Sequence, residues 1–381
     1  MSETTTTIQN TAQTHAVVDS STLAGRRGRQ MAAIGALNIV HKNPVPGSPS
    51  AEALASGIGP TPAHNLINRG GRTIRDLTYV NLYVAGNTAW SASDIQNIDN
   101  ALAGAMTDVR LDTVINQYFA DGPVSTTPAP SQKLAGAKPR KVSRANVTSL
   151  VRAHVVKSGL LNRFDAANTV FNFLLPRGVV LTTDGGAQAN EDGDAAGEPA
   201  VTTVTTIRSG NTITTVTVET RSAASTDGDD GDREKKEGPL SGDPDDAASS
   251  LQGLGGYHGS VHIAGTVVYF SVAVFSEELP NGSENGIVAF DQPWKNVVGT
   301  LYHELQEART DPDVEDAIRT QNLSFIGWNS EQGEEIGDFP VFEADPLQEV
   351  FKEVPLVLGG TAPIQLMYSN RVNGPEDPTS N

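Results

Sequence analysis

Three residues between positions 303 and 307 have the types and the spacing needed to bind a metal ion and to use it. His303 and Glu307 are four positions apart, so on a helix their side chains lie on one face, one turn apart. A neutral imidazole and a carboxylate placed in this way can bind one divalent cation, and zinc is the metal we expect. Glu304 would lie beside the ion, where it can take a proton from metal-bound water. The segment therefore predicts a metal site at His303 and Glu307, with Glu304 as its general base.

A site of this kind needs a third protein ligand and an acceptor that orients the histidine ring. A second group of carboxylates follows the motif, namely Glu331, Glu334, Glu335 and Asp338. We expect Glu335 and Asp338 to fill the two roles. The alternative interpretation of both segments is an exposed amphipathic helix with an incidental histidine, followed by a solvated acidic loop.

The motif lies in the strongest helical pattern of the chain, Gln292–Arg309, which follows the strongest strand pattern, Thr266–Phe275. Two further strands are predicted at Thr78–Val84 and Thr169–Leu175, and a helix at Ala92–Ala105 begins behind a serine cap. The expected fold class is α+β, with a mixed sheet backed by helices, one of which carries the site. Weaker patterns predict two further helices, at Leu111–Phe119 and Asn146–Ser158. They also predict extended segments at Gly178–Leu181, Leu356–Leu358 and Ile364–Tyr368. Residues 124–143 resemble a linker, and Gly327–Phe339 is predicted to be a polar loop.

Composition divides the chain into a folded part and two polar segments. Residues 1–70 are rich in Thr, Ser, Ala, Gly and Pro, and we expect them to be mostly disordered. Residues 184–250 hold 15 acidic and 5 basic side chains, a local charge of −10 within the −18 of the whole chain. We expect this stretch to be a large acidic insertion, partly disordered, with one β-hairpin in which Val201–Ile207 pairs with Thr212–Glu219. The folded domain is then 71–375.

Charge and cysteine content exclude several classes of function. A net charge of −18 opposes binding to nucleic acid or to an anionic membrane surface. The absence of cysteine excludes disulfides, thiolate metal ligands and a cysteine nucleophile. No apolar run is long enough to cross a membrane, and the N-terminus lacks the pattern of a secretory signal. These features favour a cytoplasmic protein and leave its oligomeric state open.

An ordered series of motifs resembles a known family, the phosphate-induced, EXORDIUM-like proteins of plants and their bacterial and fungal zincin-like relatives. The central match is His303-Glu304-Leu-Gln-Glu307-Ala-Arg-Thr310-Asp311-Pro312, followed by Gly327-Trp328 and by Gly333-Glu-Glu335-Ile336-Gly337-Asp338. Shorter matches are Phe173-Leu-Leu-Pro-Arg-Gly178-Val179, Gly256-Tyr257-His258-Gly259 and Tyr368-Ser369-Asn370. The resemblance covers residues 71–375, interrupted by the acidic segment.

The resemblance implies a zincin-like fold and a zinc-dependent hydrolase, in particular a metallopeptidase that acts on a peptide or protein substrate. In zincins an edge strand aligns the substrate beside the metal helix, and here a strong strand precedes the helix. Members of the family are usually secreted, which contrasts with the features that favour the cytoplasm. The alternative function is a non-catalytic, EXORDIUM-like binding or surface protein with a structural or vestigial metal site.

Carried over residue by residue, the resemblance implies that His303 and Glu307 bind the metal and that Glu304 is the base. It also implies that Glu335 is the next ligand and that Asp338 supports His303.

Three further residues follow from the same resemblance. Asp311 would orient the end of the helix or the site. A metzincin-like count of ten positions from His303 would choose Asp313 instead, which we rank lower. His258 is a candidate ligand or substrate-binding residue, and its alternative role is that of a buried structural histidine.

Overall fold

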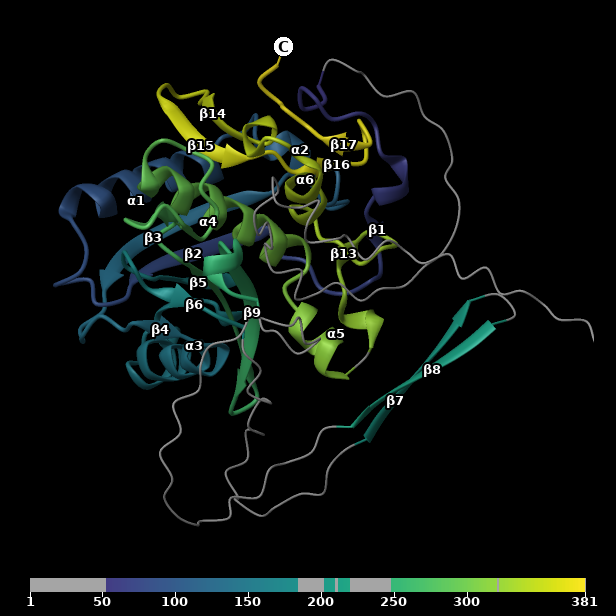
Figure 1. Cartoon of the computed structure of the whole chain (residues 1–381), viewed down its shortest axis with the longest axis horizontal. Coiled ribbons are helices and arrows are strands. Elements are labelled where there is room, and N and C mark those ends of the chain that lie inside the picture. The colour runs from purple at the N-terminus through teal and green to yellow at the C-terminus, as the bar shows by residue number, and fades with distance from the viewer. Residues whose placement is uncertain (1–52, 184–201, 210–211, 220–247, 321, 381) are drawn as a thin grey trace, which may run out of the picture.

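The computed structural model of the chain describes residues 53–183, 248–320 and 322–380, together with the backbone of 202–209 and 212–219. The described residues form a mixed α/β structure with a central mixed sheet and six α-helices (Figure 1). The sheet separates two layers, with α1 and α4 on one face and α3 on the other. The predicted combination of a mixed sheet with helices packed on it is therefore confirmed.

The central sheet has five strands in the order β3-β2-β5-β10-β9. The first four run parallel to one another, and β9 is antiparallel to β10 at the edge. The three predicted strands of this sheet are present as β2, β5 and β10, and the edge is formed by β9 and not by the strongest predicted strand. The bounds are β2 Asp76–Tyr83, β3 Ser125–Lys133, β5 Thr169–Leu174, β9 Gly256–Ile263 and β10 Thr266–Ala273.

The predicted linker at 124–143 is wrong, because it contains β3 at the outer edge of the sheet. Pro128 and Pro130 lie within this strand. Proline has no N–H group to donate, and an edge strand accommodates it because one side of the strand has no partner strand. The prolines and the serine- and threonine-rich composition concealed the strand.

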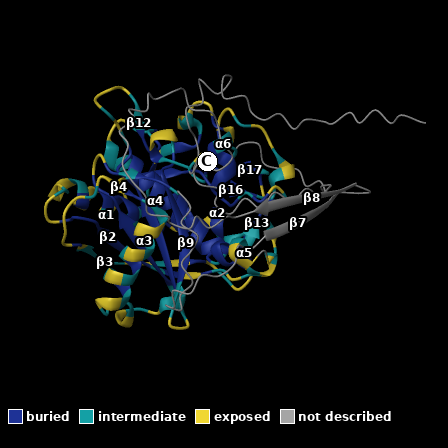
Figure 2. Cartoon of the chain, turned by 60° about the horizontal axis from the view of Figure 1, so that its bottom comes forward, coloured by how far each residue is buried: buried dark blue, intermediate teal, exposed yellow. Residues whose placement is uncertain are grey.

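Helices α1 (Ala92–Met106) and α4 (Pro293–Thr310) pack against each other on one face of the sheet. α1 begins at the predicted cap, where Ser91 Oγ accepts a hydrogen bond from the N–H of Asp94. Every residue of α4 from Asn296 to Thr310 is buried, and the helix is dark blue in Figure 2. The alternative of an exposed amphipathic helix is therefore wrong.

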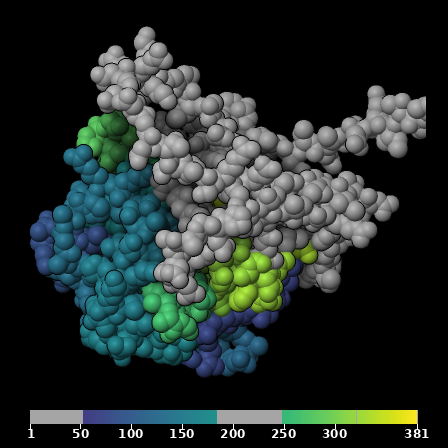
Figure 3. Space-filling model, turned by 90° about the horizontal axis from the view of Figure 1, so that it is seen from below, coloured from purple at the N-terminus to yellow at the C-terminus, as the bar shows by residue number. Residues whose placement is uncertain are grey.

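The opposite face of the sheet is covered by α3 (Arg144–Leu150), which continues as a π-helix over Val151–Lys157. Seen from below, residues coloured teal form one side of the molecule, and residues coloured lime green, the colour range of α5 (Val314–Thr320), lie next to them (Figure 3). Side chains of a strand point alternately to the two faces of a sheet. One apolar cluster therefore packs beneath α1 and α4, and a second packs beneath α3.

The remaining elements are short. Residues 356–358, predicted as a strand, lie in the turn between β14 and β15, and the predicted helix at 111–119 is shortened to α2. The elements are α2 Asp112–Asn116, α6 Asp338–Glu343, β1 Ile67–Asn68, β4 Lys141–Val142, β6 Val180–Leu181, β11 Glu277–Glu278, β12 Glu284–Asn285, β13 Trp328–Asn329, β14 Phe351–Pro355, β15 Thr361–Gln365, β16 Tyr368–Ser369 and β17 Gly374–Pro375.

The two polar segments are described only in part. Residues 53–70 join the folded part upstream of its predicted start, since β1 pairs with β13 and Leu54 forms a bridge with Glu376. Residues 1–52, and most of the predicted insertion at 184–250, lie outside the described residues. Within that stretch β7 (Thr202–Ser209) and β8 (Thr212–Glu219) form the predicted antiparallel hairpin. None of the described helices is long and apolar enough to span a membrane.

Candidate metal centre

Helix α4 places the first two predicted ligands side by side. His303 Nε2 lies 2.9 Å from Oε2 of Glu307, and each residue is 1% exposed. The spacing of four positions on a helix produces this pairing directly. α4 holds the pair in place because it packs against α1, β9, β10 and β15.

Gln365, on β15, sets the orientation of the His303 ring. Its Nε2 donates to the carbonyl oxygen of Gly337 at 2.6 Å, so its Oε1 must face His303 Nδ1, at 2.8 Å. A carbonyl oxygen only accepts hydrogen bonds, so His303 carries its proton on Nδ1. Nε2 faces Glu307 and carries a second proton when no metal is bound, since the pKa of His303 is raised to about 9. A metal ion would take the place of that proton.

Asp338 completes a group of three potential ligands with His303 and Glu307, whose ligand atoms all lie within 4.8 Å of one another. Its Oδ2 accepts from the N–H of Glu335 at 3.0 Å, whereas its Oδ1 is buried without a hydrogen-bond partner. Asp338 was expected to support the His303 ring. Gln365 has that role instead, which leaves Asp338 free to act as the third ligand.

Gly337 allows this close arrangement. A Cβ atom at this position would lie 2.2 Å from His303 Nδ1, which no side chain permits. The N–H of Gly337 donates to Glu307 Oε1 at 3.2 Å. The glycine thus lets the 333–338 loop approach α4 closely enough to bring Asp338 into the group.

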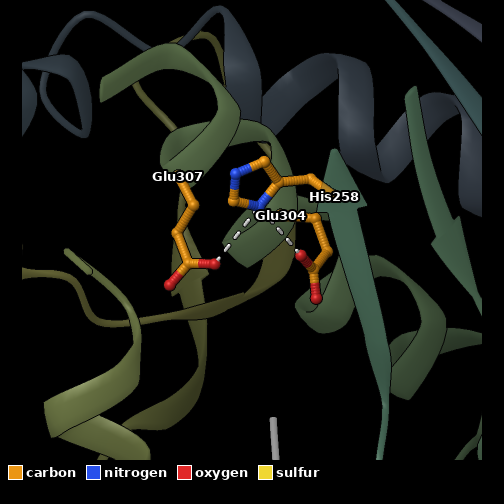
Figure 4. A group of neighbouring side chains, drawn as sticks. All are labelled: His258, Glu304 and Glu307. Carbon is orange, nitrogen blue, oxygen red and sulfur yellow. Dashed lines mark ion pairs between the residues drawn. The ribbon is translucent and has the colours of Figure 1, made fainter. Parts of the chain in front are cut away.

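A second group consists of His258, Glu304 and Glu307 (Figure 4). His258 lies on the edge strand β9, and its Nδ1 is 3.5 Å from Glu304 Oε2 and 3.6 Å from Glu307 Oε2. Its Nε2 lies 3.2 Å from the carbonyl oxygen of Asp311. Glu307 therefore belongs to both groups.

The three remaining candidate carboxylates, Glu335, Asp311 and Asp313, lie in three different environments. Glu335 Oε1 lies 3.5 Å from His258 Nε2 and has no hydrogen-bond partner, so Glu335 lies beside His258 and outside the group of His303. Asp311 Oδ1 accepts from the N–H of Gly327 at 3.0 Å, which ties the end of α4 to the next loop. Asp313 accepts from the hydroxyl of Tyr269 at 2.7 Å and belongs to neither group.

The acidic residues 331 and 334 do not join either group. Glu334 Oε2 lies 2.7 Å from His64 Nδ1, and the same oxygen accepts from the hydroxyl of Ser330 at 2.7 Å. We call the buried ionisable side chains of this region the cluster: His258, His303, Glu304, Glu307, Asp311, Glu335 and Asp338. The predicted acidic loop is divided, because Glu335 and Asp338 belong to the cluster and Glu334 forms an ion pair outside it.

Burial and crowding perturb the ionisation of the cluster. Burial raises the pKa of Asp338 to about 8 and that of Asp311 to about 7, and it raises the pKa of Glu304 and, strongly, that of Glu335. Burial opposes the charges of His303 and Glu307 as well. Their mutual attraction outweighs it, so the pKa of His303 rises to about 9 and that of Glu307 falls to about 2.

A row of hydrogen-bonded polar side chains crosses the sheet and ends beside His258. Asn81 donates to Asp99 of α1 at 2.8 Å, Asn172 donates to Asn81 at 2.9 Å, and Ser271 donates to Asn172 at 2.8 Å. Ser271 is the register partner of His258 on β9. The row occupies one register of the sheet on the face beneath α4, and it satisfies amides that would otherwise be costly to bury.

The donor atoms fit a divalent cation such as zinc. Zinc bonds to imidazole nitrogen and carboxylate oxygen at about 2.1 Å, so the ligand atoms of a tetrahedral site are about 3.4 Å apart. The distances of 2.9, 3.5 and 3.6 Å within the two groups lie close to that separation. The unpartnered Asp338 Oδ1 is a buried acceptor for which a cation would supply the missing charge.

No family model, curated protein or solved structure matches this chain. The geometry of the cluster therefore carries the functional argument.

Sequence reasoning missed Gln365 altogether. It stands in the apolar stretch Ala362–Met367, and it is 0% exposed. An amide among apolar strand residues was the one available signal, since a buried amide needs hydrogen-bond partners. Its actual partners come from segments far away in the sequence.

Proposed function

We propose that this chain is a zinc-dependent hydrolase of zincin-like fold, and specifically a metallopeptidase. The observation that carries the proposal is the pairing of His303 Nε2 with Glu307 Oε2 on one helix, with the ring oriented through Gln365. The expected edge strand, Thr266–Phe275, lies inside the sheet as β10, and the strand that packs on that helix at the edge is β9, which we propose in its place as the strand that aligns the substrate. The series of motifs shared with EXORDIUM-like proteins supports the same assignment.

His303, Glu307 and Asp338 would hold the ion. A zinc ion there supplies a Lewis acid and lowers the pKa of a bound water. Glu304 is the residue proposed to take the proton from the attacking water. It follows His303 directly in the sequence, and burial raises its pKa, which is the direction that suits a general base near neutral pH.

An extended peptide is the substrate class that this arrangement favours. A peptide chain can add to an exposed sheet edge through its backbone, which places its carbonyl groups at a fixed distance from the helix behind. β9 carries His258 among its residues, so a peptide aligned along it would pass close to Glu304. Residues 256–261 of β9 are buried and α5 contacts the strand, so such a peptide would first have to displace part of this cover. The charge of −18 makes nucleic acid an unsuitable substrate.

The second candidate function is a non-catalytic protein of the same fold with a structural metal. It is favoured by burial, since the seven ionisable side chains of the cluster are at most 5% exposed. Structural metal sites are closed, whereas catalytic sites keep a position open. Two cavities of about 450 and 430 Å³ lie elsewhere, between α1 and the β14–β15 turn and beneath α3, and no cluster residue lines either of them.

Metal analysis combined with a cleavage assay separates these functions. The purified chain is analysed by plasma mass spectrometry and incubated with a diverse peptide library whose products are identified by mass spectrometry. We expect bound zinc and peptide cleavage, and we expect Glu304→Gln to keep the ion held by His303 and Glu307 but to lose cleavage by a factor of 10² or more, roughly the contribution of a general base. Zinc without cleavage would support the structural function. The absence of zinc would exclude the hydrolase and the structural site, and would leave the non-catalytic protein with a vestigial site.

A further inference from the structure

We propose that the cluster holds a second cation site, formed by His258, Glu304 and Glu307, beside the site of His303, Glu307 and Asp338. Glu307 is the ligand common to both, and the second ion belongs to the same class, a divalent cation such as zinc. The inference deepens the proposed function, because it rests on the first site binding a metal. Figure 4 shows the three side chains of the second site, contributed by β9 and α4.

The two histidines are held in the same way. Each ring has one nitrogen directed at the oxygen of a neutral acceptor: His303 Nδ1 at Gln365 Oε1, and His258 Nε2 at the carbonyl oxygen of Asp311. An acceptor of this kind requires the facing nitrogen to carry a proton. The remaining nitrogen of each ring is directed at the same oxygen, Glu307 Oε2, at 2.9 Å and 3.6 Å.

The two sites are nevertheless distinct. Among the described residues, each group of ligand atoms that lie within 4.8 Å of one another contains one histidine only. A single ion bound by both imidazoles would require the two rings to join one group. Glu307 lies between the two rings and would be the ligand that the two ions share.

The cluster holds more carboxylates than its two imidazoles can pair. Five carboxylates are at most 2% exposed: Glu304, Glu307, Asp311, Glu335 and Asp338. Burial raises the pKa of all of them except Glu307, so protons neutralise most of this charge when no cation is bound. A second cation would take the place of such protons, at a group that supplies one imidazole and two carboxylates.

An ion in the second site would occupy the carboxylate of Glu304 that we propose as the base. The second site therefore regulates the first: at low zinc Glu304 is free to accept a proton, and at high zinc its lone pair is taken. Because the two ions repel each other, the second binds more weakly.

Zinc stoichiometry tests this inference without an assay of activity. The full-length chain is stripped with a chelator, dialysed against graded concentrations of zinc chloride, and analysed for zinc per chain by plasma mass spectrometry. We expect two equivalents in the wild type, in two steps, and one in His258→Ala. His262→Ala is the matched control, because it removes a histidine from the same strand that belongs to neither group, and we expect it to bind two. Non-specific binding to the acidic chain is common to all three proteins and cancels in the comparison.

Each outcome has a distinct meaning. One equivalent in both the wild type and His258→Ala overturns the second site and leaves the proposed function intact. No binding in the wild type overturns both. Loss of all zinc in a folded His258→Ala, judged by circular dichroism, also overturns the second site, because His258 then belongs to a single centre. If His258→Ala does not fold, Glu304→Gln decides: one equivalent supports the inference, and two contradict it.

Discussion

The two faces of the central sheet are built from the same strands but differ in kind. The face beneath α3 carries a cluster of apolar side chains, among them Phe171, Phe173 and Phe270. The face beneath α4 carries the row from Asn81 to Ser271, which ends beside His258, and α4 adds buried carboxylates above it. Successive residues of one strand therefore serve two different purposes.

This difference teaches which face carries the chemistry. Apolar burial contributes about 25 cal/mol per Å² with no need for partners, and each face has an apolar cluster that stabilises the fold. Buried polar groups return little net stability even when they are fully hydrogen-bonded, and they are costly when they are not. The polar groups added to the α4 face therefore have a purpose other than packing.

Removing a large side chain from the α3 face should give the largest effect on stability. Phe173→Ala leaves a cavity in a close-packed cluster, and we expect the free energy of unfolding to fall by about 3–5 kcal/mol in urea titrations. Zinc stoichiometry should not change at temperatures where the variant is folded. Phe164→Ala, at the half-buried margin of the same cluster, is the control and should cost less. Equal losses in the two variants would contradict the assignment of this face.

Zinc itself should stabilise the α4 face. At a free zinc concentration of about 100 Kd, binding to the folded state alone raises the free energy of unfolding by about 2.7 kcal/mol, measurable as a higher Tm. His303→Ala should remove the part of this gain that the first site contributes, His258→Ala combined with His303→Ala should abolish it, and His262→Ala should retain it. A zinc-dependent rise in Tm that persists in the double variant would place the metal elsewhere.

The hydrogen bond from Gln365 to His303 should matter for affinity. We expect Gln365→Leu to weaken zinc binding by about 10–100-fold, because the residues that orient a ligand histidine usually contribute that much. Isothermal titration calorimetry measures the change. Gln348→Leu removes a glutamine that bonds to the carbonyl oxygen of Ala289, outside the cluster, and should bind zinc like the wild type. Unchanged affinity in Gln365→Leu would remove the argument for the orientation of the ring.

The polar row should give the smallest effect. Ser271→Ala removes the donor to Asn172, and we expect a loss of about 1 kcal/mol in the free energy of unfolding, with zinc affinity changed less than twofold, roughly the scale of a single hydrogen bond remote from the ligands. Ser283→Ala, near the surface, should have no measurable effect. A large loss of zinc affinity in Ser271→Ala would mean that the row positions His258 and does more than satisfy buried amides.

The sequence determined the parts of this protein that depend on neighbours in the chain. The periodicity of 292–309 predicted α4, and the spacing of four predicted the pairing of His303 with Glu307, since a helix brings those positions together whatever surrounds it. Apolar runs predicted β2, β5 and β10 because parallel strands are buried on both faces. β3 was missed because its prolines are tolerated only at a sheet edge, and strand order cannot be read from a local pattern.

Only the tertiary structure decided how the cluster is divided. Gln365 reaches His303 across 62 positions, and His258 reaches the carbonyl oxygen of Asp311 across 53. The same long-range packing turned Asp338 toward His303 and Glu335 toward His258, whereas the sequence had suggested Glu335 as the ligand and Asp338 as the support of His303. The physical reason is that helix geometry is set by local hydrogen bonds, whereas a ligand set is completed by strand register and loop closure between distant segments.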